Sequence, residues 1–245
     1  SLIVGEIWNY PEEWFPAVDA VMNMTARELI LRMVKQETTG AQAGRLLDMM
    51  IRDAGIDNML KSWIILDNHD TPRLRTLFED EWQQQMAQVL QFTLPGAPCL
   101  YYGVEAGMEG GWDPEMRGPM RWEDAKPGKP HYDWLKSLID MRQNNRALRI
   151  GNFRHIPSEA LLAYMRETDR VGETIVVVAN PSDEDVTELL LVPDSKIMNY
   201  SVLKDQLSDE EVRVLSGTLP VTIPPQSVYA LKVETDVGKE YTPFK

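Results

Sequence analysis

Residues 63–73 read Trp-Ile-Ile-Leu-Asp-Asn-His-Asp-Thr-Pro-Arg, an apolar run followed at once by a polar cluster. The run Trp63–Leu66 is short and rich in isoleucine, which predicts a strand buried on both faces. Segments with helical periodicity lie on either side of it. Buried strands that alternate with helices indicate βαβ units, so we expect a parallel sheet with this polar cluster at the carboxyl end of one strand.

The same alternation continues in both directions and covers the first 150 residues. Four strands in all are too few for a complete (β/α)8 barrel, which needs about 250 residues, so the sheet is either an open four-stranded one or half of such a barrel. The other predicted strands are Leu2–Gly5, Ala17–Met22 and Pro98–Tyr102. The first predicted helix opens with a capping-box pattern at Thr25, and the second ends at Gly55. The third spans Glu79–Phe92, and the fourth contains Trp134–Met141 and ends near Arg146.

Polar residues stand at the ends of the four predicted strands. The first strand is followed by Glu6, the second by Asn23, the third by residues 68–70 and the fourth by Tyr101-Tyr102-Gly103. In a (β/α)8 barrel, the active site is built at the carboxyl ends of the strands. We therefore expect the functional site at this edge of the sheet.

The composition changes near residue 150. Residues 151–245 contain no tryptophan and consist of short β segments separated by turns such as Asn180-Pro181-Ser182-Asp183. This spacing predicts an antiparallel β-sandwich, so we expect two domains, 1–150 and 151–245, with a boundary near Gly151. The predicted strands are Leu161–Arg166, Thr174–Asn180, Thr187–Val192, Tyr200–Leu203, Val212–Leu215, Thr218–Ile223 and Ser227–Val233.

Charge and composition exclude several classes of function. The 245 residues include 38 acidic and 25 basic side chains, a formal net charge of −13, so we expect neither nucleic acid nor an anionic membrane surface as a partner. No apolar run approaches the ~20 residues that span a bilayer. One cysteine, Cys99, and three histidines do not supply a disulfide framework or a metal cluster, so no metal and no cofactor is expected.

Glu6 and Asp70 are the leading candidates for catalysis. Paired carboxylates can protonate a leaving oxygen and stabilise an oxocarbenium-like centre, as cleavage of a glycosidic bond requires. A glutamate at the end of an apolar strand is suited to the role of general acid, because burial raises its pKa. Structural roles are the alternatives: Glu6 would close a loop or pair with an arginine, Asp70 would cap a helix with Pro72 in its first turn, and His69 would be a structural histidine.

Three ordered motifs resemble the α-amylase family, glycoside hydrolase family 13. They are Val4-Gly5-Glu6-Ile7-Trp8, Leu66-Asp67-Asn68-His69-Asp70-Thr71-Pro72-Arg73 and Pro98-Cys99-Leu100-Tyr101-Tyr102-Gly103. The run Trp112–Trp122 is similar to the loop after the eighth barrel strand in neopullulanases, cyclomaltodextrinases and maltogenic amylases. The resemblance covers essentially the whole chain and implies barrel strands five to eight, followed by the family's C-terminal β domain.

The resemblance implies a role for each matching residue. Glu6 corresponds to the general acid/base, and Asp70 to the aspartate that binds sugar hydroxyls at the point of cleavage. His69 and Asn68 stand beside it and are expected to bind the same sugar. The remaining candidates for substrate binding are the aromatic residues Trp8, Tyr102 and Trp112, and Arg73 and Arg117, for which a structural ion pair is the alternative.

The resemblance also implies a residue that this sequence does not contain. The family's nucleophile is an aspartate after the fourth barrel strand, preceded at two residues' distance by an arginine, and no such motif is present. A retaining mechanism needs a nucleophile about 5 Å from the acid. We therefore expect the C-terminal half of an enzyme that hydrolyses or transfers α-1,4 or α-1,6 glucosidic bonds of starch-derived glucans or cyclodextrins, inactive or nearly so as an isolated chain.

Hypotheses of other classes stay open at this point. The chain could bind α-glucan without cleaving it, or assemble with itself or with a chain that supplies the missing half barrel, because open sheet edges favour association. An unrelated four-stranded α/β domain is a third hypothesis. The sequence does not fix the compartment, with the cytoplasm favoured over the periplasm or secretion.

Overall fold

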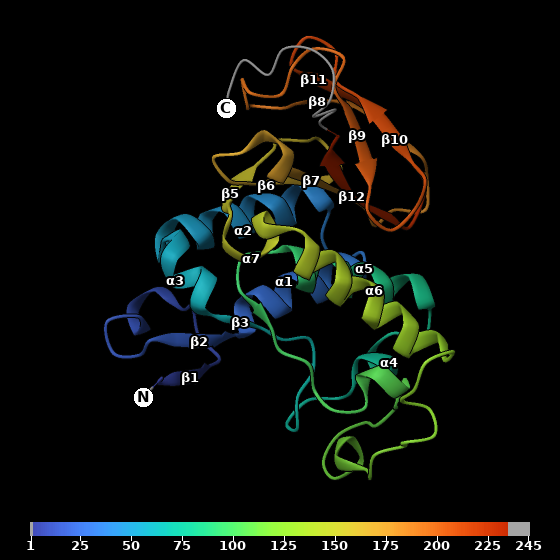
Figure 1. Cartoon of the computed structure of the whole chain (residues 1–245). Helices are drawn as coiled ribbons and strands as arrows, with labels where there is room; N and C mark the ends of the chain where they lie inside the picture. Colours follow the sequence, from blue (N-terminus) through green and yellow to red (C-terminus); the bar gives the residue numbers. More distant parts are fainter. Residues whose placement is uncertain (1, 235–245) are drawn as a thin grey trace.

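The computed structural model describes residues 2–234, and its first part is built on a four-stranded parallel sheet (Figure 1). The predicted parallel arrangement is confirmed. β1 and β4 each pair with one strand only within the described residues, so both edges of this sheet are open there. Residues 235–245 of the predicted second domain lie outside the described residues. The strands, in the order in which they pair, are β1 (Val4–Ile7), β2 (Ala20–Asn23), β3 (Trp63–Ile64) and β4 (Ala97–Pro98).

Helices connect these strands. α2 (Gly40–Ala54), α5 (Glu81–Thr93) and α6 (Pro130–Asn144) lie where the periodicity predicts them. α2 ends at Gly55, whose positive φ of 78° is the conformation that glycine adopts without strain. The shorter helices are not predicted, because four to six residues are too few to show a helical period. They are α3 (Ile56–Lys61), α4 (Leu74–Leu77) and α7 (Arg146–Ile150), with 3₁₀ turns at Glu12–Trp14, Val104–Ala106, Glu115–Arg117 and Val171–Glu173.

α1 (Met24–Val34) begins one residue before the predicted capping box. Its N-cap is Asn23, the last residue of β2, whose side-chain oxygen accepts a hydrogen bond from the Ala26 amide at 2.9 Å. Thr25 already lies in the first turn, so the prediction that it caps the helix is wrong. Asparagine is at least as good a cap as threonine, and here it lets the strand pass into the helix without a loop.

β4 is shorter than the predicted strand Pro98–Tyr102. The Cys99 amide still donates to Ile64 O at 2.9 Å, and the chain then leaves the sheet. Gly103 has φ 89°, and a Cβ at this position would lie 2.9 Å from Arg73 Nη1. Tyr101 and Tyr102 therefore belong to a loop beyond the strand end, packed closely against Arg73.

The second part is the predicted antiparallel β-sandwich. A six-stranded sheet has the order β10-β9-β12-β7-β6-β5, and a two-stranded sheet of β8 and β11 packs on it. β5 (Asn152–His155) is not predicted, because three of its four residues are polar and give no apolar alternation. The others are β6 (Leu162–Glu167), β7 (Ile175–Asn180), β8 (Val186–Leu191), β9 (Val202–Asp205), β10 (Glu211–Arg213), β11 (Thr218–Ile223) and β12 (Ser227–Val233).

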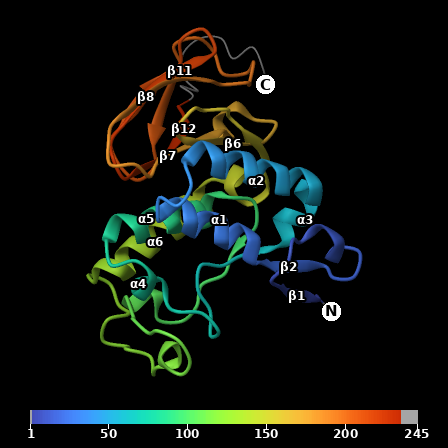
Figure 2. The same cartoon turned by 180° about the vertical axis from the view of Figure 1, so that it is seen from behind.

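One hydrophobic core joins the two parts. Helices α1, α2, α5 and α6 form a layer between the parallel sheet and the six-stranded sheet (Figures 1 and 2). Successive residues of a strand face opposite sides, so Tyr164 and Val177 pack against these helices while Ala163 and Val176 pack inside the sandwich. β6 and β7 are consequently buried along their whole length.

Two arginines, Arg166 fully buried and Arg142 half-buried, connect the end of α5 to its neighbours. Arg142 comes from α6 and Arg166 from β6, and all their partners are backbone carbonyl groups. Burial lowers the pKa of Arg142 to about 10 and that of Arg166 to about 9, so both remain charged at neutral pH. The acceptors, at 2.5–3.1 Å, are the oxygens of Phe92 and Gly96 for Arg142, and of Thr93, Gly151 and Asn152 for Arg166.

Candidate active site

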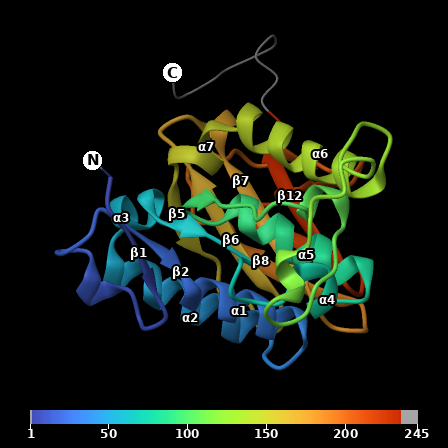
Figure 3. The ribbon, with the colours of Figure 1, turned by 90° about the horizontal axis from the view of Figure 1, so that it is seen from below.

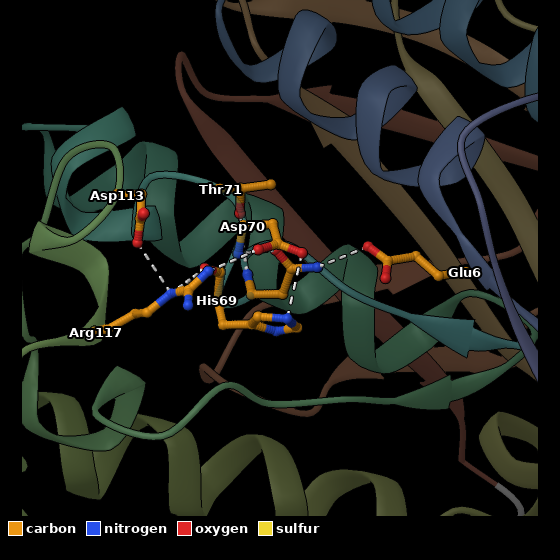
Figure 4. A network of polar contacts seen from close by, with 7 residues as sticks. Glu6, His69, Asp70, Thr71, Asp113 and Arg117 are labelled. Carbon is orange, nitrogen blue, oxygen red and sulfur yellow. Dashed lines mark hydrogen bonds and ion pairs between the residues drawn. The ribbon is translucent and has the colours of Figure 1, made fainter.

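The candidate residues gather at the carboxyl edge of the parallel sheet. Glu6 lies on β1, the loop 67–73 follows β3, and Tyr102 follows β4. Seen from below, β1 and β2 lie on one side of the molecule and α4 to α6 on the other (Figure 3). Asn68 Nδ2 lies 3.5 Å from Glu6 Oε1 and joins the ends of β1 and β3 (Figure 4). Side chains 62 residues apart in the sequence thus meet at one place.

The loop after β3 is fixed by hydrogen bonds of its own side chains. Asn68 Oδ1 accepts from the Asp70 amide at 2.9 Å, and Thr71 Oγ1 accepts from the Asn68 amide at 3.0 Å. Asp67 Oδ2 accepts from the amide of Leu74, the first residue of α4, at 2.8 Å. The base of the loop is therefore rigid, whereas the Asp70 carboxylate at its tip is exposed.

Arg117 connects this loop with the segment that follows Trp112. Its Nη2 lies 3.0 Å from Asp70 Oδ1, and its Nε lies 3.2 Å from Asp113 Oδ1 and donates to His69 O at 3.0 Å (Figure 4). His69 Nε2 lies 3.2 Å from the other carboxylate oxygen of Asp70. Arg117 thus fixes the orientation of the Asp70 carboxylate through a charge-assisted hydrogen bond, and the imidazole of His69 lies near its other oxygen.

Two exposed tryptophans flank a groove beside this loop. Trp8 is 58% and Trp112 70% exposed, and both line a cavity of about 300 Å³ together with Thr71 and Pro72. The rest of the lining is mostly charged, so the groove combines two aromatic side chains with a charged wall formed by Arg27, Glu28, Arg32, Lys35 and Glu37. Tyr102 lines a different groove, of about 470 Å³, so the structure does not bring it together with the tryptophans.

Arg73 is buried, contrary to the expectation that it contacts substrate. Arg73 is 1% exposed. Its guanidinium carbon lies 4.6 and 4.7 Å from the ring centroids of Tyr101 and Tyr102. Nη1 donates to Tyr102 O at 2.5 Å, and the Arg73 amide donates to Gly110 O at 2.9 Å. Arg73 thus has a structural role beneath the loops, through cation–π contacts with the two tyrosines. It does not form the structural ion pair that was the alternative to substrate binding.

Three other expectations about the acidic residues are wrong. Asp70 does not cap a helix, because α4 begins at Leu74 and the Asp67 carboxylate accepts the hydrogen bond from that amide. Glu6 is exposed, so the burial expected for it is not found, and no arginine pairs with it within residues 2–234. The physical reason is that β1 is an edge strand, and a side chain at its end faces solvent.

Asp67 is a residue of the site that sequence reasoning missed. It is 4% exposed, and this burial raises the pKa of its carboxyl group to about 6, against the opposing effects of the Leu74 amide, Arg73 and Arg27. Burial, with a contribution from Asp67, also raises the pKa of the Cys99 thiol. An acidic residue directly after an apolar strand was the signal that could have indicated a buried carboxyl group.

Replacing Asp67 by asparagine is expected to stabilise the protein at neutral pH. The folded pKa of about 6 lies above the unfolded value of about 3.9, so ionisation costs free energy in the folded state. That cost is absent below about pH 4, grows from there to pH ~6, and amounts to about 3 kcal/mol above it. Urea unfolding should give Asp67→Asn a larger unfolding free energy by about 2–3 kcal/mol at pH ~7.5 and no difference at pH ~4. A difference that does not change with pH would contradict this origin.

Residues 2–234 contain neither a metal-binding cluster nor a membrane-spanning helix. No three His, Cys, Asp or Glu side chains gather there in a way that could hold a metal ion. Over the same residues, the helices are too short or too polar to cross a membrane.

Comparison with known proteins identifies the family. Residues 2–150 match the model of the alpha-amylase catalytic domain, and residues 152–229 match that of the maltogenic amylase C-terminal domain. The first match alone covers more than half of the sequence. The chain belongs to the alpha-amylase family, which confirms the resemblance seen in the motifs.

The relatives are named as enzymes and are longer than this chain. A cyclomaltodextrinase of Geobacillus thermopakistaniensis (strain MAS1) is 31% identical over 245 residues, covering 95% of this chain and 40% of that protein. Neopullulanase 2 of Thermoactinomyces vulgaris is 34% identical over 236 residues, covering 92% and 39%. The debranching enzyme of Nostoc punctiforme shares the fold, with a TM-score of 0.77, 22% identity, and coverage of 95% of this chain and 50% of that one. The chain thus spans about two fifths of the length of the two curated relatives.

Proposed function

We propose that this chain carries part of the active site of a retaining glycoside hydrolase or transglycosylase. Its substrates would be α-1,4 or α-1,6 glucosidic bonds of starch-derived glucans or cyclodextrins. The observation that carries the proposal is the meeting of Glu6 with the Asn68–Asp70 loop at the carboxyl edge of a parallel sheet. The names of the relatives, a cyclomaltodextrinase and a neopullulanase, support this class of substrate.

In this proposal each exposed group has a chemical role. Glu6 protonates the leaving glycosidic oxygen and later activates water or an acceptor hydroxyl, and Asn68 orients its carboxyl group from 3.5 Å. Asp70 Oδ1 accepts a hydrogen bond from Arg117 Nη2, and the remaining lone pairs of both Asp70 oxygens accept hydrogen bonds from sugar hydroxyls. The groove between the two exposed tryptophans receives a neighbouring glucose unit.

We propose that the nucleophile comes from residues outside this sequence. A retaining mechanism places it about 5–5.5 Å from the acid, and Asp70 is assigned to hydroxyl binding. The greater length of the relatives and the two open edges at β1 and β4 support this division. In this proposal β1 to β4 are barrel strands five to eight, residues 1–150 and 151–245 are the two domains, and further strands pair with the open edges. These strands would come from a longer polypeptide or from a partner chain.

A non-catalytic α-glucan-binding or assembly protein is the second candidate. The exposed groove between Trp8 and Trp112 favours it, because stacking on a sugar requires no nucleophile. Both candidates predict glucan binding. Only the first predicts cleavage once the missing strands are supplied.

Titration of the isotopically labelled chain with maltoheptaose tests the proposed site by NMR. We expect shifts of the amide resonances of residues 68–71 and of the indole resonances of Trp8 and Trp112. Asp70→Asn is expected to weaken the apparent Kd by about ten- to hundredfold, because a hydrogen bond to a charged group contributes about 1.5–3 kcal/mol. Asp209→Asn, at a fully exposed position in the second part, is the matched control. Shifts confined to the β-sandwich would contradict the proposal.

A further inference from the structure

Asp67 lies at the base of the loop that presents the candidate sugar-binding groups. It follows the buried residues Ile65 and Leu66 and directly precedes Asn68. Its hydrogen bond from the Leu74 amide, at 2.8 Å, closes the loop from its first residue to the start of α4. One buried carboxyl group therefore fixes both ends of the segment that carries Asp70.

Charged or titratable groups from three elements face this carboxyl group. Arg27 comes from α1 and donates through Nε to Leu66 O at 2.8 Å, next to Asp67 in the chain. Arg73 lies at the other end of the loop, and Cys99 follows β4. Neither arginine forms an ion pair with Asp67 among the described residues, and their positive charges lower its pKa only against the larger effect of burial.

Arg73 extends this attraction to the loop after β4. Its guanidinium lies against the rings of Tyr101 and Tyr102, and Nη1 donates to Tyr102 O. The other two nitrogens, Nε and Nη2, are buried and have no hydrogen-bond partner among the described residues. The position of this cation therefore depends on the two rings, on Tyr102 O and on the backbone at Arg73, where the next amide, that of Leu74, donates to Asp67.

We propose that Asp67 is a positioning residue, an inference that rests on the proposed function. Its charge holds the loop 67–73, which carries Asp70, and the loop after β4, which carries Tyr102, in fixed positions relative to each other. Ionised, it accepts a charge-assisted hydrogen bond from Leu74 and attracts both arginines. Protonated, it leaves Arg27 and Arg73 facing a neutral group, and both loops shift. Because burial raises the pKa of this carboxyl group to about 6, the change falls in the mildly acidic range.

The pH dependence of amide resonances tests this inference without any ligand. In the unmodified chain, the amides of Leu74, Asp70 and Gly103 are expected to shift together with a midpoint at pH ~6. In Asp67→Asn this transition is expected to disappear, and in Asp209→Asn it is expected to persist. His69→Gln is measured as well, because the imidazole lies 3.2 Å from Asp70, and there the Leu74 transition is expected to remain.

Two results of the NMR experiment would overturn the inference. One is a Leu74 transition that survives in Asp67→Asn, because another group would then be its source. The other is a transition at Leu74 that leaves Asp70 and Gly103 unchanged, because Asp67 would then cap α4 without positioning either loop.

Maltoheptaose affinity, measured by calorimetry at pH ~5 and pH ~7.5, supplies the functional readout. For the unmodified chain we expect binding about fivefold weaker at the lower pH, and for Asp67→Asn we expect the weaker value at both. The same pH dependence in both proteins would refute the positioning role. Absence of maltoheptaose binding at either pH would instead count against the proposed function, and the amide transitions would still decide the role of Asp67.

Discussion

Glu6→Gln is expected to lower kcat/KM for maltooligosaccharides by about 10²–10⁴-fold when the nucleophile-bearing strands are present, which is the usual contribution of general acid–base catalysis. Glutamine preserves the size of the side chain and can still accept the hydrogen bond from Asn68. It cannot give a proton to the glycosidic oxygen. The loss should therefore appear mainly in kcat, with little change in glucan affinity.

The leaving group separates loss of the acid from general damage to the site. Fluoride departs without protonation, so hydrolysis of maltosyl fluoride should lose far less than hydrolysis of maltooligosaccharides. Glu13→Gln, on the exposed 3₁₀ turn that follows β1, is the matched control and should leave both activities unchanged. Equal losses on the two substrates would contradict the assignment of Glu6 as the acid.

Arg166→Met is expected to destabilise the fold by about 3 kcal/mol or more, because each buried acceptor left without its donor costs about 1–3 kcal/mol. Arg166 is fully buried and donates to the carbonyl oxygens of Thr93, Gly151 and Asn152. Methionine removes the desolvation penalty of the cation, which partly offsets the loss. Three unpaired carbonyl groups at the junction of α5, α7 and β5 outweigh that gain.

Thermal unfolding measures this effect. For a chain of this size, about 3 kcal/mol corresponds to a decrease in Tm of roughly 6–12 °C. Arg166→Lys retains the charge but not the fork of donors, so its Tm should lie between those of the unmodified chain and Arg166→Met. Arg170→Met, at a largely exposed position nearby in the sequence, should change the unfolding free energy by less than about 0.5 kcal/mol. An unchanged Tm for Arg166→Met would show that the desolvation penalty dominates.

The long elements of the fold could be predicted because their burial is regular. β7 is apolar on both faces since it lies between the helical layer and β8–β11, and this burial produces the continuous run Ile175–Ala179. α2 shows its period over 15 residues and stops at a glycine. The end of β4 could not be predicted, because apolar residues continue past it and the turn depends on packing of Gly103 against Arg73.

The location of the candidate site could be predicted, but not the depth of its residues. The carboxyl ends of parallel strands meet at one edge, so Glu6 and the residue 68–70 cluster were expected together. Which side chains of that cluster point outward is set by hydrogen bonds within the loop, such as those of Asn68 and Asp67. A single sequence carries no pattern for these bonds, so the burial of Arg73 and Asp67 was missed.

Release of reducing sugar by the purified 245-residue chain tests the proposed division of the active site. The substrates are maltoheptaose, a cyclodextrin and a nitrophenyl maltoside, at protein concentrations at which maltoheptaose binding is measured. We expect binding without turnover above the buffer rate, because Glu6 and Asp70 lack a nucleophile in this chain. Robust turnover that Asp70→Asn abolishes would contradict this, since Asp70 would then be the nucleophile and the active site would be complete.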